Sequence, residues 1–151
     1  MKNPLNMPMF STDLVLLNVD LTQPLFLPFF DTRLSAGFPS PAEDYSISSI
    51  DIGEFVTSNP LSTFFVRVQG DSMIDAHITD GCLLAVDKSL IAKSGDIIVA
   101  VVNNEFTVKR LSVKAKKVFL VPENKKYQPI EITEEMNFQV WGKVVTIMNK
   151  P

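Results

Sequence analysis

The chain has 151 residues, 46% of them hydrophobic and 21% charged, with a formal net charge of −3 at pH 7 and a single cysteine. These values predict one globular domain with a modest appendage, and they exclude an intrachain disulfide and a thiolate metal cluster. An isolated DNA-binding domain is usually basic because Lys and Arg contact the phosphates, so the acidic balance argues against direct sequence-specific DNA binding.

Residues 1–43 differ in composition from the rest of the chain. They carry six of the ten prolines, together with four phenylalanines between positions 26 and 38. Proline fixes φ and donates no backbone hydrogen bond, so a long helix or central strand is not expected, yet the stretch is too apolar for a solvated tail. No apolar run approaches the about 20 residues that span a bilayer, and Lys2 alone is too little for the basic start of a secretory signal. We therefore predict an extended N-terminal arm that packs against something, in a soluble cytoplasmic protein without a membrane partner.

Residues 44–151 have the pattern of a mainly β domain. Asp51 is placed to cap a short helix over residues 52–58, which ends before Pro60. Asn103 and Asn104 suit a tight hairpin turn, because asparagine tolerates positive φ. Runs rich in β-branched and aromatic residues predict strands over 63–68, 82–86, 97–102, 105–113, 117–121 and 138–148. We expect a compact antiparallel β domain that carries the arm.

Few residues support familiar catalytic or metal chemistry. His77 is the only histidine and lies five residues beyond Ser72. A segment that short joins the two only in a special turn, so we interpret His77 as a surface or turn residue and not as the base of a Ser-His-Asp triad. Asp71, Asp75 and Asp80 lack the spacing of a calcium loop, and no Cys/His pair or phosphate-binding glycine motif is present. We interpret the three aspartates as a solvated acidic turn and expect no metal and no cofactor.

Gly70-Asp71-Ser72-Met73 directly follows the first predicted strand of the domain. Glycine lets the backbone turn sharply and brings backbone N–H groups near the serine oxygen, which is the geometry that acyl transfer needs. The same tetrapeptide also fits an ordinary turn between strands, so by itself it indicates catalysis only weakly.

A serine nucleophile without a histidine needs another base, and a neutral lysine can serve. Lysine has an ordinary pKa near 10.4, so catalysis at neutral pH requires burial to bring that value close to about 7. Lys109 differs from the lysines in polar clusters because it lies inside the strand predicted over 105–113, where alternation places Thr107, Lys109 and Leu111 on one face. The pattern alone fits equally a lysine that points to solvent from an edge strand.

The motifs that carry a family resemblance are spread over residues 24–147 and include Ala36-Gly37-Phe38-Pro39-Ser40-Pro41-Ala42, Gly70-Asp71-Ser72-Met73-Ile74-Asp75, Asp80-Gly81-x-Leu83-Leu84, Gly95-Asp96, Glu105-Phe106-Thr107-Val108-Lys109, Pro122-Glu123-Asn124 and Tyr127-x-Pro129-Ile130. Together they resemble the UmuD/LexA family of self-cleaving proteins. In that family the serine after Gly-Asp is the nucleophile and the lysine of the Thr-Val-Lys strand is its base, and Ser72 and Lys109 occupy those positions. The family is cut before the glycine of the first motif, which implies scission between Ala36 and Gly37.

The resemblance implies a fold like that of LexA and signal peptidases, and a serine endopeptidase with a Ser-Lys dyad. Backbone N–H groups of Asp71 and Ser72 are the natural oxyanion donors. It also implies a homodimer, stimulation by the RecA filament on single-stranded DNA, and a processed form that serves a UmuC-type Y-family translesion DNA polymerase in the SOS response. A repressor would carry a helix-turn-helix domain before the protease, whereas the 36 residues before the proposed cut contain four prolines. This favours the UmuD branch.

Two other functions stay open from the sequence. A non-enzymatic binding module would use the same β fold and a docking arm without cutting. A truncated repressor-like regulator would need a DNA-binding surface, which the acidic composition does not favour. Residues 1–20 have no counterpart in the resemblance, and Cys82 stands where an aspartate is more familiar.

Overall fold

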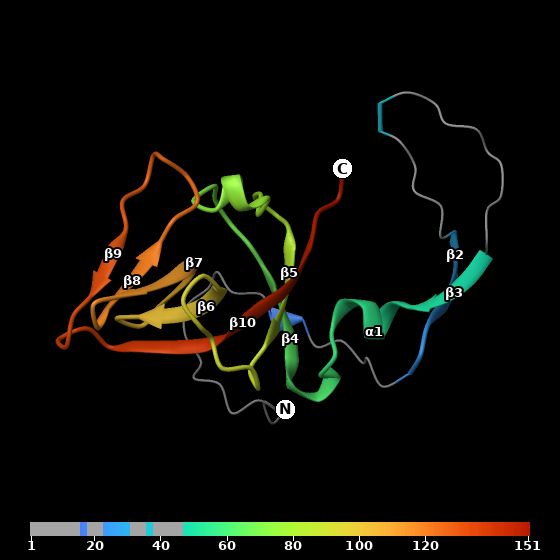
Figure 1. The fold of residues 1–151 in the computed structure, drawn as a ribbon, viewed down its shortest axis with the longest axis horizontal. Coiled ribbons are helices and arrows are strands. Elements are labelled where there is room, and N and C mark those ends of the chain that lie inside the picture. The colour runs from blue at the N-terminus through green and yellow to red at the C-terminus, as the bar shows by residue number, and fades with distance from the viewer. Residues whose placement is uncertain (1–15, 18–22, 31–35, 38–46) are drawn as a thin grey trace.

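The structure is a computed structural model that describes residues 16–17, 23–30, 36–37 and 47–151 (Figure 1). Its helices are short: α1 spans Ile52–Val56, and two 3-10 helices span Pro60–Ser62 (η1) and Ile74–Ala76 (η2). The strands are β1 (Leu16–Leu17), β2 (Phe26–Phe30), β3 (Ile47–Asp51), β4 (Thr63–Arg67), β5 (Leu83–Asp87), β6 (Ile97–Val102), β7 (Glu105–Lys114), β8 (Lys117–Val121), β9 (Ile130–Ile132) and β10 (Phe138–Met148). Within these ranges, no helix is long and apolar enough to cross a membrane.

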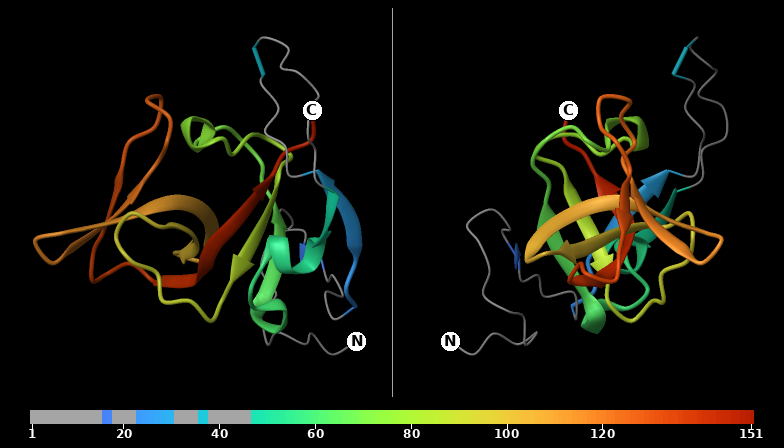
Figure 2. Two further views of the ribbon diagram at one scale, coloured as in Figure 1. Left: turned by 45° about the vertical axis from the view of Figure 1, so that its right-hand side comes forward. Right: turned by 90° about the vertical axis from the view of Figure 1, so that its left-hand side faces the viewer.

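Antiparallel pairing organises the strands into one large sheet and one ribbon. Within the described residues, eight strands form the large sheet in the order β1-β4-β5-β10-β6-β7-β8-β9, and β2 pairs with β3. Strand β10 lies centrally, because its first half pairs with β6 and its second half with β5. Figure 1 and the left view of Figure 2 show the ribbon β2–β3 beside α1, on the side away from β8 and β9. The mainly β, antiparallel fold is therefore confirmed.

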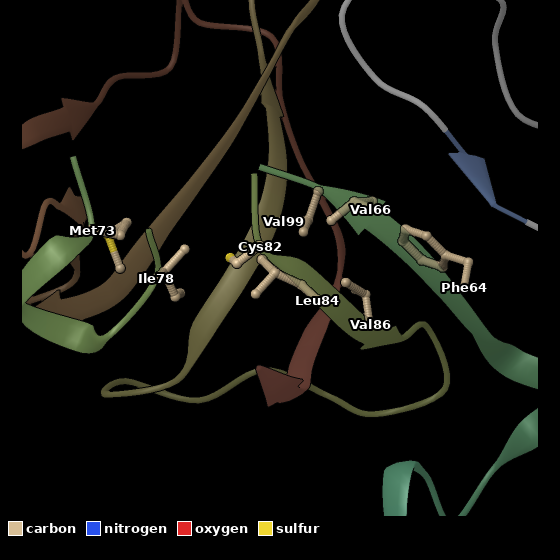
Figure 3. Packing of buried hydrophobic residues seen from close by; sticks show 8 residues of the cluster. All are labelled: Phe64, Val66, Met73, Ile78, Cys82, Leu84, Val86 and Val99. Atoms are coloured by element: carbon tan, nitrogen blue, oxygen red, sulfur yellow. The ribbon is translucent and has the colours of Figure 1, made fainter. Parts of the chain in front are cut away.

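The main hydrophobic core lies between β4, β5 and β6 and extends to the turn after β4 (Figure 3). It consists of the buried side chains of Phe64, Val66, Met73, Ile78, Cys82, Leu84, Val86 and Val99. Met73 and Ile78 are only 2% and 0% exposed and flank η2 on either side. Fully burying such a side chain contributes about 1.5–3 kcal/mol, so this turn is fixed against the sheet by its own apolar residues.

The start of the domain matches the predicted capping but not the predicted length of the helix. The Oδ1 atom of Asp51 accepts a hydrogen bond of 2.9 Å from the Gly53 N–H, as an N-cap does. The helix ends at Val56 and not at residue 58, because Thr57 has an extended backbone with φ of −154°.

The predicted strands of the domain are found with nearly the predicted bounds. Those predicted over 97–102, 117–121 and 138–148 correspond to β6, β8 and β10 without change. Strands β4 and β7 differ from the prediction by one residue at one end, and β5 is shifted by one residue at both ends. Asn103 and Asn104 form the turn between β6 and β7 with φ of 49° and 70°, as expected for a tight hairpin.

Four strands, β1, β2, β3 and β9, were missed by the sequence analysis. All five residues of β2 are exposed, and β3 and β9 are mostly exposed. They therefore lack the alternation of buried and exposed residues that identifies a strand. Pro28 is tolerated in β2 because, among the strands that the structure describes, β2 pairs with β3 alone.

Candidate active site

Ser72 lies on the tight turn between β4 and η2. Gly70 has a φ of 93°, which glycine adopts readily and other residues do not. Its N–H donates to the Oδ1 atom of Asp80 at 2.7 Å, which closes the turn. Directly after Ser72, the side chain of Met73 enters the core. The local sequence thus presents the serine hydroxyl at the surface of a turn that is anchored on both sides.

Lys109 reaches Ser72 from β7, across 37 residues of sequence. Its Nζ atom lies 2.9 Å from the Oγ atom of Ser72. The same atom donates to the Oγ1 atom of Thr107 and to the carbonyl oxygen of Val108, each at 2.9 Å. Thr107 and Lys109 therefore share one face of β7, as alternation predicts, and that face is turned toward the serine and not toward solvent.

The environment of Lys109 disfavours its charged form. Burial lowers the pKa of the Lys109 ammonium below its ordinary value. None of the ion pairs among the described residues involves Lys109, so no carboxylate offsets the loss of hydration. A lysine in this position gives up its proton more readily than a lysine in water.

A pocket of about 390 Å³ opens over the two side chains. It lies between the end of β4, with the residues that follow it, and the first half of β7. Arg67, Gln69 and Glu105 supply polar groups to the lining, and most of the remaining side chains are apolar. The lining residues are Val66, Arg67, Val68, Gln69, Gly70, Ser72, Met73, Val99, Glu105, Phe106, Thr107, Val108 and Lys109. A pocket of this kind can receive an extended peptide with small or apolar side chains.

The backbone N–H group of Ser72 has no acceptor in the described part of the chain. It donates to no described residue, whereas the N–H groups of Ile74 and Asp75 donate to the carbonyl oxygens of Asp71 and Glu123. The N–H of Asp71 contacts the carboxylate of its own residue and helps to lower the pKa of that carboxylate. One donor, at Ser72 itself, is therefore free to bind an oxyanion.

Ala36 and Gly37 lie outside this pocket. Both are exposed, and neither contributes to the pocket lining. Figure 1 places them beyond the ribbon β2–β3, apart from η2 and the turn that carries Ser72. The structure thus brings together Ser72 and Lys109 but not the bond proposed for cleavage.

The remaining acidic and imidazole groups have other positions. His77 is an exposed turn residue with φ of 61°, as the sequence predicts. Asp75 and Asp80 are exposed, but Asp71 is not a simply solvated carboxylate. Its Oδ1 atom accepts a hydrogen bond from the Tyr127 hydroxyl. The interpretation of all three as one solvated turn is therefore corrected for Asp71.

The loop after β8 supplies contacts that the sequence analysis did not predict. Asn124 and Tyr127 contact Asp71 from more than 50 residues away. These residues appear in the motifs of the family resemblance, but no periodicity or spacing in the chain indicates that they lie beside the serine.

Comparisons with known proteins assign the chain to a family. The family model described as Peptidase S24-like matches residues 28–145. The chain is 43% identical to the protein MucA of Salmonella typhimurium over 119 residues, which cover 78% of this chain and 81% of that protein. It is 42% identical to the protein SamA of Salmonella typhimurium over 123 residues, 82% of this chain and 85% of that protein. It is also 36% identical to a LexA repressor of Magnetococcus marinus over 76% of this chain and 49% of that protein.

Proposed function

The chain belongs to the Peptidase S24-like family, and we propose that it is a self-cleaving serine endopeptidase in which Ser72 is the nucleophile and Lys109 the general base. One observation carries this proposal: the Nζ atom of Lys109 lies 2.9 Å from the Oγ atom of Ser72, in surroundings that lower the pKa of that lysine by burial. A nucleophile and a base within hydrogen-bond distance are what covalent catalysis needs.

The first step transfers the serine proton to the lysine. Neutral Lys109 accepts the proton from the Ser72 hydroxyl while the Oγ atom bonds to the carbonyl carbon of Ala36. The carbonyl oxygen becomes an oxyanion, for which we propose the N–H groups of Ser72 and Asp71 as donors. The Ser72 N–H is free, whereas the Asp71 N–H would turn from its own carboxylate to the oxyanion. General base catalysis of this kind contributes roughly 10²–10⁴-fold to a rate.

The second step breaks the peptide bond and regenerates the base. As the oxyanion collapses, the bond between the Ala36 carbon and the Gly37 nitrogen breaks, and the lysine ammonium gives its proton to that nitrogen. Water then hydrolyses the ester between Ala36 and Ser72, with Lys109 again as the base. The products are a fragment that ends at Ala36, a fragment that begins at Gly37, and the original site.

Cleavage requires that the arm, residues 1–43, place Ala36 in the pocket of the domain formed by residues 44–151. The structure holds Ala36 and Gly37 apart from that pocket, so we regard it as the uncut form before docking. A small residue followed by glycine can kink into a narrow cleft. Because the substrate is tethered, proximity replaces affinity for free peptides. Docking can occur within one chain or between the two subunits of a homodimer.

The cellular role that we propose follows the family resemblance and the similarity to MucA, SamA and a LexA repressor. The RecA filament on single-stranded DNA would stimulate cleavage by favouring the docked arm or the neutral lysine. The processed form would act in the cytoplasm as the accessory subunit of a UmuC-type Y-family polymerase during SOS mutagenesis.

The test is the intact mass of purified protein after incubation at pH 10, where more Lys109 is neutral than at pH 7. We expect a new fragment that begins at Gly37. It should be absent from Ser72→Ala and Lys109→Ala and present in Lys114→Ala, a matched control because Lys114 ends the same strand and is exposed. A cleavage rate that is independent of protein concentration would indicate docking within one chain or within a stable homodimer, and not between molecules that meet by diffusion.

The contrary result is an uncut chain even with RecA, ATP and single-stranded DNA added. That outcome would exclude the protease and favour the binding module. The exposed apolar side chains of β2 and Phe55 give such a module a possible docking surface.

A further inference from the structure

The loop between β8 and β9 contacts the turn that carries Ser72 through its main chain. The Glu123 N–H donates to the carbonyl oxygen of Ser72 at 2.9 Å, and the Asp75 N–H donates to the carbonyl oxygen of Glu123 at 2.8 Å. Glu123 thus forms main-chain hydrogen bonds both with Ser72 and with η2, the helical turn that follows it. Figure 2 shows the β8–β9 loop close to η2 in both views.

Two side chains of the same loop hold the residue before the serine. The Nδ2 atom of Asn124 donates to the backbone carbonyl oxygen of Asp71 at 2.9 Å and approaches the Oδ2 atom of the same residue at 3.3 Å. The Tyr127 hydroxyl donates to the Oδ1 atom of Asp71. Both the main chain and the carboxylate of Asp71 are therefore fixed from one side.

The contact between Tyr127 and Asp71 shifts the pKa values of both groups in the directions that preserve it. The hydrogen bond from Tyr127 is the main cause that lowers the pKa of Asp71, with a further contribution from the charge of Lys126. The same hydrogen bond raises the pKa of Tyr127 above its ordinary value. The Asp71 carboxylate therefore stays ionised to a lower pH, and the Tyr127 phenol keeps its proton to a higher pH, than the same groups do without this hydrogen bond.

The loop is itself tied to the strand that carries Lys109. Arg110, the next residue on β7, forms an ion pair with Glu123 through its Nε atom, and its Nη1 atom donates to the carbonyl oxygen of Gly95 at 2.7 Å. Because neighbouring residues of a strand point to opposite faces, β7 reaches the serine with Lys109 on one face and holds the loop with Arg110 on the other. The two catalytic side chains are thus positioned through one connected set of contacts.

We propose that Asn124 and Tyr127, backed by the ion pair between Arg110 and Glu123, are positioning residues that hold the Ser72 turn at the distance from Lys109 that proton transfer needs. This inference rests on the proposed function of Ser72 and Lys109. Neither side chain touches the reacting atoms in the structure: both act through Asp71. A displacement of about 1 Å in such a site can slow a reaction by about 10²-fold.

A positioning role and a general opening of the pocket would have different effects on the pKa of Lys109. The pKa of Lys109 is lowered by burial, and the pocket around it is lined by β4, by the turn and by β7, with Arg67 and Glu105 as its other charged groups. Loss of an Asn124 or Tyr127 contact leaves that lining in place. Cleavage should therefore become slower at every pH, while the pH at which the rate is half-maximal stays where it is in the wild type.

The experiment measures self-cleavage from pH 7 to pH 11 in the full chain, together with the rate at which a small alkyl fluorophosphonate modifies Ser72. The second rate does not depend on docking of the arm. The variants are Tyr127→Phe, Asn124→Ala and Asn124→Asp. Asn124→Asp keeps the shape of the side chain, removes the donor and places a carboxylate that repels the carboxylate of Asp71, so it carries the test if the alanine variant unfolds. Lys125→Ala, an exposed neighbour in the same loop, is the matched control.

We expect both rates to fall by about 10-fold or more in Asn124→Asp and by several-fold in Tyr127→Phe, with an unchanged half-maximal pH and with Lys125→Ala equal to the wild type. Wild-type rates in all three Asn124 and Tyr127 variants would overturn the positioning role and leave the protease standing. A half-maximal pH that moves up toward that of an ordinary lysine would also overturn it, because the effect would then come from opening of the pocket. A wild-type chain that neither cuts itself nor reacts at Ser72 would overturn the proposed function and this inference with it.

Discussion

Asp87 and Lys109 are two ionisable side chains that the same sheet withdraws from water, with opposite results. Asp87 is 1% exposed, and its carboxylate accepts hydrogen bonds of 2.6–2.8 Å from Asn59, from Ser62 and from the N–H and hydroxyl of Ser89. Burial alone would raise the pKa of Asp87, but these donors outweigh burial and lower it. Lys109 has no carboxylate partner among the described residues, so burial alone acts on its pKa and lowers it.

The fold therefore stabilises the charged form of Asp87 and destabilises the charged form of Lys109. A buried carboxylate with four donors contributes to stability and stays ionised. A half-buried ammonium without a counter-ion is a cost to the fold, and such costs concentrate where chemistry needs a shifted pKa. On this basis we interpret Asp87 as a structural residue and propose a functional role for Lys109.

The largest effect is expected from Lys109→Arg, which keeps the positive charge but not the ability to lose a proton. Arginine stays protonated throughout the range in which proteins are stable, so it cannot act as the base. Self-cleavage, followed by intact mass from pH 7 to pH 11, should fall at least about 100-fold at every pH. The control variant Lys114→Arg, which changes a lysine on the same strand, should cleave itself at the wild-type rate. A Lys109→Arg variant with the wild-type pH profile would show that the charge, and not the proton, is what matters at this position.

A smaller effect, on stability and not on cleavage, is expected from Asp87→Asn. Asparagine leaves part of the donor set of Asn59, Ser62 and Ser89 without a charged acceptor, so the free energy of unfolding in urea at pH 7 should fall by about 1–3 kcal/mol. Cleavage measured well below the unfolding midpoint should not change. Asp75→Asn, at an exposed carboxyl group of η2, is the control and should leave the free energy of unfolding unchanged.

The pH dependence of that difference checks its cause. Because the pKa of Asp87 is lower in the folded state than its ordinary value of 3.8, its stabilising contribution is present above that value and is lost as the pH falls through the folded pKa. The difference between wild type and Asp87→Asn should therefore stay constant from pH 7 to pH 5 and shrink below that. If the difference grows in acid, the carboxylate is not the group that the donors stabilise.

Most of the domain could be predicted from the sequence because its strands alternate or are continuously apolar, which is the pattern that burial on one or both faces imposes. Strand β6 has four buried residues in a run and was placed with its observed bounds. Strand β2 has none, so its pairing with β3 left no local signal.

The candidate site divides in the same way. The turn at Gly70 and the face of β7 that carries Lys109 follow from local rules, namely the conformational freedom of glycine and strand alternation. The contact between Ser72 and Lys109 is a tertiary contact. The family resemblance predicted it, whereas no local sequence pattern indicates it. The contacts of Asn124 and Tyr127 with Asp71 are of this second kind and were missed. Residues 1–15, 18–22, 31–35 and 38–43 of the arm lie outside the described residues, so the prediction of an extended arm there stays a prediction.

The most direct test of the contrast is the titration of Lys109 itself by NMR. The Ser72→Ala variant prevents cleavage during the measurement. The Lys109 signal is identified as the one that is missing from the spectrum of the double variant Ser72→Ala/Lys109→Arg. Burial predicts a midpoint below the ordinary value of 10.5 for Lys109. A midpoint at or above 10.5 would contradict the account, because Lys109 would then hold its proton as firmly as a lysine in water and could not serve Ser72 as a base.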